Sequence, residues 1–234
     1  MKTSNRILFI TGIVITVILL ISVIGSRIFL NRFTDSFEKG DQNYSSIETE
    51  YSEITGFTGL DVTGDWEVTI SRGDVYSITV KASKSSENPY EIEKQGNTLL
   101  LKENQKINLN RKLTVDITMP EISEVYSQGG LKLVLTGFTE PRLILNLTGG
   151  SWVNGSDCEF ENLNLTSAGA INLEFEEIKT VNTDVQLSGA GNLLFNMAGG
   201  ILSGNAAGAV NIEYYGNARQ EITTAGIANI DRRD

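Results

Sequence analysis

Closely spaced carboxylates are the residues of this sequence that could do chemistry. Glu174, Glu176 and Glu177 form one group, and Glu159 and Glu161 form another. Alternate residues of a strand share a face, so Glu174 and Glu176 would project together, as the paired acids of a glycosidase do. No Lys or Arg directly adjoins either group. We therefore assign no catalytic residue, and an enzyme is the least favoured of the hypotheses below.

Histidine is absent, and Cys158 is the single cysteine. A chain without His has no Ser-His-Asp or Cys-His arrangement and lacks the commonest metal ligand. One Cys can form neither an intrachain disulfide nor a zinc site, so we expect Cys158 to be a small buried hydrophobe. The glycine-aspartate nonapeptide of calcium-binding β-rolls is missing too, so we expect no metal and no cofactor.

Two short motifs have ordinary structural interpretations. Arg72-Gly73-Asp74 spells an integrin-type tripeptide at a predicted hairpin tip. Gly-Asp is also common turn chemistry, which is the interpretation we favour. N-x-S/T sequences would matter only in a glycosylating secretory pathway, and we interpret them as strand and turn residues. They begin at Asn43, Asn146, Asn154 and Asn164.

Charge is distributed unevenly along the 234 residues. Residues 1–33 carry four basic side chains and no acid, which leaves 15 basic and 29 acidic side chains, a net charge of −14, for the remainder. An acidic body repels phosphate backbones, so we expect no nucleic-acid partner.

An apolar N-terminal segment precedes the body of the chain. Residues 7–26 are all uncharged. A helix of that length is about 30 Å long, which matches a bilayer core. A cleaved signal peptide is the alternative, although its apolar region is usually shorter. We expect a short cytoplasmic end (1–6), a transmembrane helix (7–26) and a linker (27–53). The C-terminal domain would then be extracytoplasmic, in the periplasm or at the cell surface.

The body, residues 54–234, has the alternating apolar pattern of β-strands. In its first section, 54–125, apolar residues alternate over 66–70 and 76–80 on either side of a turn. This pattern predicts a hairpin. A second hairpin is predicted to turn at Gly96-Asn97, and 113–117 is a further strand. We expect this section to be an antiparallel unit with one buried face.

Glycines recur at a nearly fixed interval in the second section, 126–234. Most of them have a short alternating run before and another after; they are Gly129, Gly149, Gly169, Gly189, Gly208 and Gly226. A period of about 20 residues predicts stacked coils, that is, a parallel β-solenoid. An antiparallel meander with a hairpin at each glycine would have the same alternation, so periodicity alone leaves both open.

Two nine-residue copies show how the repeat is used. "SAGAINLEF" (167–175) and "AAGAVNIEY" (206–214) agree in residue class at most positions. Their apolar residues should point inward and the alternate residues outward. The outward residues are Asn172, Glu174, Asn211 and Glu213. We expect the stacked Asn side chains to hydrogen-bond along the repeat, with an interaction surface for a ligand as the alternative.

The turns "SAGAIN", "SGAGNL", "AAGAVN" and "TAGIAN" resemble the head-GIN domain family of autotransporter-adhesin-like bacterial envelope proteins. The opening "GFTGLDVTGDWEVTISRGDVYSITV" and the strand "VDITMPEISEV" are also similar to that family, so the resemblance covers about 54–234. It implies a right-handed β-helix-like solenoid, shaped like pectin lyases without their catalytic residues. It also implies a role in adhesion at the cell surface.

Three functions follow from these observations. The first is a non-enzymatic, membrane-anchored surface or envelope protein, acting as an adhesin or interaction scaffold. The second is an envelope-stress sensory or regulatory domain, and the third is a carbohydrate-active enzyme of pectin-lyase-like shape. The expected partners are the cytoplasmic membrane, through 7–26, and an unidentified surface protein or glycan, with self-association as a further option.

Overall fold

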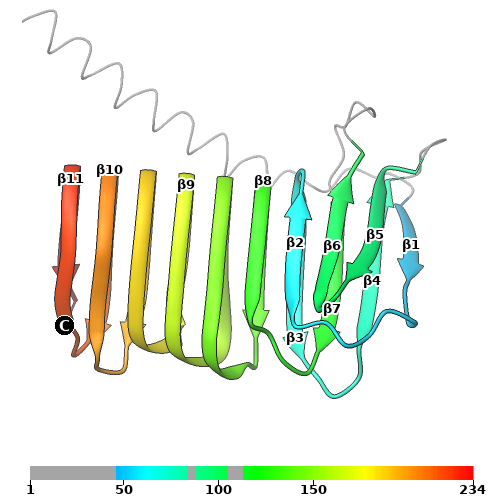
Figure 1. Ribbon diagram of the computed structural model, residues 1–234, viewed down its shortest axis with the longest axis horizontal. Helices are drawn as coiled ribbons and strands as arrows, with labels where there is room; N and C mark the ends of the chain where they lie inside the picture. The colour runs from blue at the N-terminus through cyan, green and yellow to red at the C-terminus, as the bar shows by residue number, and fades with distance from the viewer. Residues whose placement is uncertain (1–45, 84–87, 105–112, 234) are drawn as a thin grey trace, which may run out of the picture. The chain divides into compact units, whose positions relative to one another are not determined.

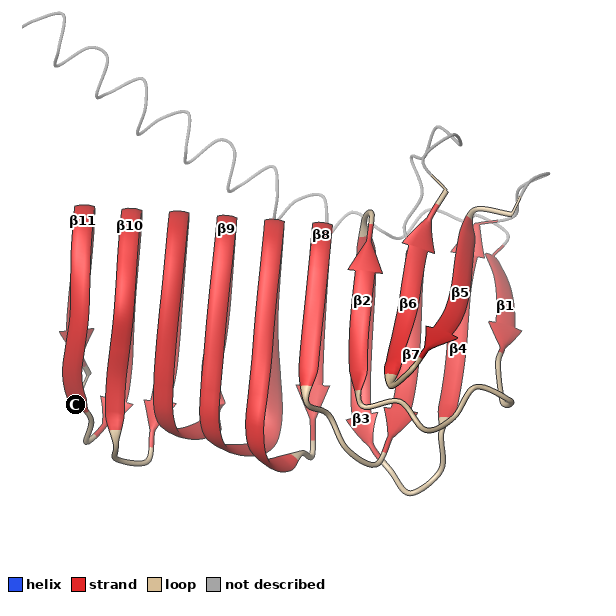
Figure 2. Ribbon diagram, viewed as in Figure 1, coloured by secondary structure: helices blue, strands red, loops and turns tan. Residues whose placement is uncertain are grey.

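A computed structural model describes residues 46–83, 88–104 and 113–233. Over these ranges all regular structure is β-strand, as the alternating pattern predicts, and no helix occurs (Figure 2). Accordingly, none of the described segments is a helix able to cross a membrane. The predicted transmembrane helix at 7–26 and most of the predicted linker lie outside the described residues.

The described strands belong to one mixed sheet (Figure 1). Seven short strands come first: β1 (Ser46–Glu50), β2 (Gly59–Thr63), β3 (Trp66–Arg72), β4 (Ser77–Ser83), β5 (Tyr90–Gln95), β6 (Thr98–Glu103) and β7 (Leu113–Met119). Four long strands follow: β8 (Glu124–Thr136), β9 (Thr139–Met197), β10 (Ile201–Gly216) and β11 (Arg219–Arg232).

The long strands pair in parallel with the period seen in the sequence. Gly129 of β8 aligns with Gly149 of β9, and Gly208 of β10 aligns with Gly189 of β9 and Gly226 of β11. We call each period a rung: a first arm before the glycine and a second arm after it. An antiparallel meander is excluded for β8 to β11, because adjacent rungs run in the same direction along both arms.

The first section is not the antiparallel unit predicted for 54–125. Its strands β2 and β3 are the two arms of one more rung and pair in parallel with the two arms of β8. Beyond them β6 pairs with β2 and β7 with β3, again in parallel. Among the described strands, the antiparallel pairs are β5 with β6, β4 with β7 and β1 with β4.

One of the two predicted hairpins is therefore wrong. The β5–β6 hairpin turns at Gly96-Asn97 as predicted. However, β3 and β4 do not pair, because β7 lies between them and pairs with both. Alternation of apolar residues reports which face is buried, and it carries no information about which strand lies alongside.

Glycine occupies each bend because neighbouring rungs approach so closely there that a side chain would clash. Gly189 has φ of 136°, and a Cβ built on it would lie 2.1 Å from the carbonyl oxygen of Gly169. Gly129 stacks in the same way on Gly64, which joins β2 to β3, so the glycine column begins well before the predicted repeats. Inward residues of both arms form one core, and five Phe side chains are its largest fully buried members.

Aromatic side chains close the core near its first rung. The Trp66 and Tyr90 rings meet edge to face, with centroids 5.9 Å apart. The Tyr51 hydroxyl donates to the Tyr90 hydroxyl at 3.5 Å, and burial and this bond raise the pKa of Tyr51 to about 12. The Phe57 and Tyr76 rings contact each other at a tilt of 52°, with centroids 4.9 Å apart, and the Tyr76 hydroxyl donates to the Phe57 carbonyl oxygen. These contacts cover apolar surface that a first rung would otherwise expose.

Candidate functional site

The outward face of the second arms carries a column of asparagines, one on each of the last four described rungs. Asn211 aligns with Asn192 on one side and with Asn229 on the other. The alignment of Gly169 with Gly189 places Asn172 beside Asn192. We call these four residues the asparagine column. It brings the two predicted residues Asn172 and Asn211 onto one face, two rungs apart, with Asn192 between them.

Hydrogen bonds along the asparagine column occur at its C-terminal end. The Asn229 Nδ2 donates to Asn211 Oδ1 at 3.1 Å and to Asp231 Oδ2 at 2.7 Å. In contrast, Asn172 Nδ2 donates to Glu174 Oε1 on its own strand at 2.7 Å. The side chains of Asn192 and Asn229 are exposed, so their amide groups are accessible to a partner.

The two predicted carboxylates do not converge on a common point. Glu213 aligns with Leu194 rather than with another acid, and Leu194 separates it from Glu174 along the column. Glu213 also forms an ion pair with Arg233. Each acid is thus held by its own neighbour, Glu174 by an amide and Glu213 by a guanidinium.

The same outward position carries different chemistry in the earlier rungs. It lies three residues after each glycine and is occupied by Glu67, Lys132 and Trp152. The Lys132 Nζ lies 4.9 Å from the Trp152 ring centroid and 3.8 Å from Glu67 Oε1. These residues were missed in the sequence, and counting three residues from each glycine would have found the last two.

The other acid group has a basic partner in the next rung. Glu159 forms an ion pair with Lys179 at 2.9 Å, although the two residues are a full period apart in the sequence. Between residues 46 and 233, within the described ranges, no three His, Cys, Asp or Glu side chains are grouped as metal ligands. An acid on this ladder can therefore meet a basic partner one period away, which its sequence neighbours do not reveal.

The tripeptide Arg72-Gly73-Asp74 does not lie at a hairpin tip. It begins at the last residue of β3 and starts the connection that passes β7 to reach β4. The Gly73 N–H donates to the Met119 carbonyl oxygen at 3.0 Å, and a Cβ on Gly73 would meet the Thr118 methyl group at 2.5 Å. Backbone pairing and close packing account for the glycine.

The family and the fold of this chain are shown by comparison with known proteins. The family model for "Putative auto-transporter adhesin, head GIN domain" matches residues 56–218. The chain belongs to this family. No curated protein matches it.

Solved structures resemble this head GIN chain in fold at low sequence identity. One is a protein from Bacteroides fragilis described as an adhesin. It is 16% identical to this chain with a TM-score of 0.63, over 81% of this chain and 97% of that one. A similarly described protein from Parabacteroides merdae is 13% identical with a TM-score of 0.48, over 82% and 98%. One from Parabacteroides distasonis, described as lipid binding, is 13% identical with a TM-score of 0.43 over the same shares. Only the first is similar enough to support the fold.

Cys158 of this head GIN domain is buried in the core, as its isolation in the sequence predicts. Its Sγ accepts from the Phe138 N–H at 3.4 Å and donates to the Ser156 carbonyl oxygen at 3.3 Å. Burial raises the pKa of the thiol. The reactive thiolate is therefore disfavoured.

The N-x-S/T asparagines are strand residues where they can be located. Asn146, Asn154 and Asn164 occupy outward positions of β9, in agreement with their interpretation as structural residues. Asn43 lies outside the described residues.

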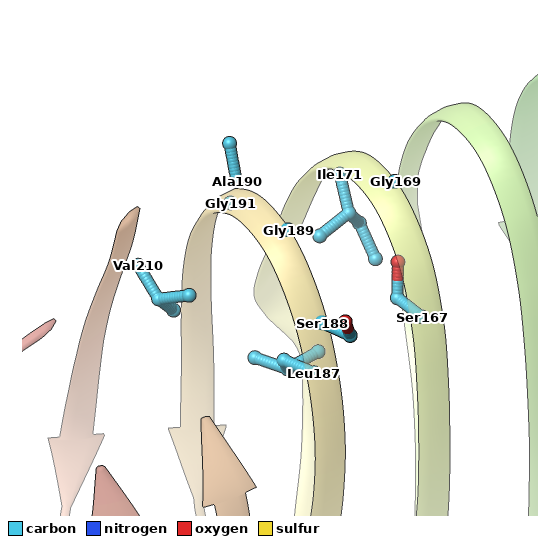
Figure 3. A pocket seen from close by; sticks show the side chains of 9 residues that line it. All are labelled: Ser167, Gly169, Ile171, Leu187, Ser188, Gly189, Ala190, Gly191 and Val210. Atoms are coloured by element: carbon cyan, nitrogen blue, oxygen red, sulfur yellow. The ribbon is translucent and has the colours of Figure 1, made fainter. Parts of the chain in front are cut away.

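A shallow hollow on the head GIN domain follows from the packing of side chains beside the bend. From Gly129 to Gly208, the inward residues two before and two after each column glycine combine one large with one small side chain, such as Ser167 with Ile171 and Leu187 with Gly191. Gly191 thus interrupts a column that holds Ile171 before it and Val210 after it. The result is a shallow surface hollow beside Gly191 (Figure 3). Because the hollow is a by-product of this alternation, we assign it no ligand.

Proposed function

We propose that this chain is a non-enzymatic surface or envelope protein that acts as an adhesin or interaction scaffold. Its ladder of parallel rungs would form a right-handed β-solenoid held outside the cytoplasmic membrane by a helix at 7–26. Membership of the adhesin-like family and the likeness to the B. fragilis structure support this proposal. The observation that carries it is the asparagine column, because it repeats one outward-facing amide on successive rungs.

A row of amides suits a polar partner such as a protein surface or a glycan. Each Asn side chain offers both a donor and an acceptor, so the row can match either kind of group on its partner. Rungs are spaced by about 4.8 Å, so the four residues cover roughly 14 Å. Trp152 lies in the next position along. It adds an aromatic surface of the kind common in binding sites.

The proposal is tested by adhesion of bacteria that display the full chain. Asn192→Ala with Asn211→Ala should reduce the number of cells bound to host-cell, matrix or glycan surfaces at least fivefold. The matched control is Gln186→Ala with Asn205→Ala, which removes two amides from the first arms of the same two rungs. The control should bind like the unmodified chain.

Two results would count against the proposal in different ways. Equal binding by both double variants would remove the asparagine column as the contact face. No binding by the unmodified chain to any surface would refute adhesion itself and favour the sensory or regulatory alternative.

A further inference from the structure

The last rung, β11, leaves one of its two edges free within the described structure. Of the described strands only β10 pairs with it. Its inward residues Ala228 and Ile230 are half-buried, whereas Val210 and Ile212 of β10, with which they align, are buried. Ile222, which aligns with Gly204, is also half-buried. A free edge presents unpaired N–H and C=O groups that can pair with another strand.

The two ends of the ladder differ in shape. Beyond the rung formed by β2 and β3, the first arms are extended by β6 and β5, and the second arms by β7, β4 and β1. This end is therefore stepped by one strand. At the other end of the described ladder both arms finish with the same strand, β11, so that end is level. A stepped end cannot pair with both arms of a level end at once, and two level ends can.

The sequence of β11 is nearly symmetric about its glycine. Ile222 and Ile230 lie four residues before and after Gly226, and Thr224 and Ala228 lie two before and after it. The first arm runs toward the bend and the second arm runs away from it. A two-fold rotation through the bend therefore lays each first arm antiparallel on the partner's second arm, with inward residues facing inward residues.

We propose that β11 is a self-association surface, through which two copies of this chain join tail to tail. The pairing extends the ladder across a two-fold axis at Gly226 and places Ile222 of each copy opposite Ile230 of the other. It provides backbone partners for the free edge and covers the half-buried apolar side chains. Because both copies use the same surface, the assembly closes as a dimer.

Charged side chains of β11, and Arg233 directly after it, face one another in this arrangement. Arg219 and Arg233 are each seven residues from Gly226, and Glu221 and Asp231 are each five residues from it. Directly opposite positions thus carry like charges, which repel each other, whereas each arginine also lies diagonally beside an acid of the other copy. Long side chains reach diagonal neighbours in antiparallel pairs.

Cysteine cross-linking of the full chain in detergent tests the geometry. Thr223 and Asn229 lie three residues either side of Gly226, so each should face the other's equivalent across the dimer. A mixture of Thr223→Cys chains with Asn229→Cys chains should give a disulfide-linked dimer, and either variant alone should not. Absence of the cross-link from the mixture would overturn the proposal.

A substitution pair distinguishes this dimer from head-to-tail assembly. Ile230→Lys should raise the dimer dissociation constant by about tenfold to a hundredfold, measured by sedimentation, because each copy loses a buried aliphatic contact. The matched control is Ile47→Lys on β1, whose side chain is 47% exposed at the stepped end. If Ile47→Lys weakened association and Ile230→Lys did not, the tail-to-tail arrangement would be wrong.

Discussion

Alanine at Gly189 should destabilise the domain much more than alanine at Gly96. Both glycines have positive φ, 136° and 59°, so both substitutions place a side chain in backbone geometry that favours glycine. They differ in surroundings: a Cβ at Gly189 would lie 2.1 Å from the Gly169 carbonyl oxygen, whereas a Cβ at Gly96 meets nothing within 4 Å. The pair therefore separates backbone conformation from the close approach of rungs.

The magnitude follows from these two contributions. Backbone conformation costs about 1–2 kcal/mol at Gly96, and about 1–3 kcal/mol at Gly189. To reach ordinary contact, the Cβ at residue 189 must move about 1.3 Å from the Gly169 oxygen, which opens rungs spaced by about 4.8 Å. Overpacking of this kind adds about 1–3 kcal/mol. For a domain of this size the additional loss is roughly 2–12 °C in melting temperature.

Thermal unfolding of the full chain in detergent, followed by circular dichroism and Trp fluorescence, measures the difference. Trp66 is buried in the core near the first rung, so its emission reports loss of that packing. Equal melting temperatures for the two variants, or a lower one for Gly96→Ala, would refute the argument that contact between rungs excludes side chains from the glycine column.

Three further outcomes are expected. Between pH 10 and about 12 the folded domain should lose stability as pH rises. The reason is that Tyr51 has a pKa of about 10 in the unfolded chain and about 12 in the folded domain, so only the unfolded chain loses the proton in this range. The melting temperature of the Tyr51→Phe variant should fall less over the same range. A Cβ at Gly191 would lie 2.8 Å from Ile171 Cγ2. Gly191→Val should therefore cost about 1–3 kcal/mol in urea unfolding. Cys158 should resist maleimide near neutral pH until urea unfolds the domain, as mass spectrometry would show, because its buried thiol has a raised pKa.

Most of the strand content could be predicted from the sequence, but strand partners in the first section could not. Alternation at Trp66, Val68 and Ile70 gives the buried face correctly, and the β5–β6 hairpin was marked by its Gly-Asn turn. The insertion of β7 between β3 and β4 has no local signal, because it depends on a much later segment of the chain returning to the sheet. Turn residues between two strands show a change of direction and do not show adjacency.

Two of the four residues of the asparagine column could be predicted from the sequence. Asn172 and Asn211 stood out because they lie in the two most similar copies, whereas Asn192 lies in a copy with glycine at residue 191 and Asn229 in a shorter one. In the structure all four asparagines align, because each lies three residues after the glycine of its rung. The rungs shorten gradually toward the C-terminus, which obscures this alignment in the sequence. The expected hydrogen bonding along the column was seen only where the Asn229 amide reaches Asn211.

The position three residues after each glycine is where the ladder is free to vary. The glycine is fixed by contact with the carbonyl of the preceding rung, and its inward neighbours are fixed by the room beside the bend. The third position faces outward and has neither constraint, which is why it accommodates residues as different as Glu67, Lys132, Trp152 and Asn192 on an unchanged backbone. A binding function that depended on this face could therefore change its partner through these side chains without disturbing the fold, and that is the physical reason to look for the ligand of this domain there.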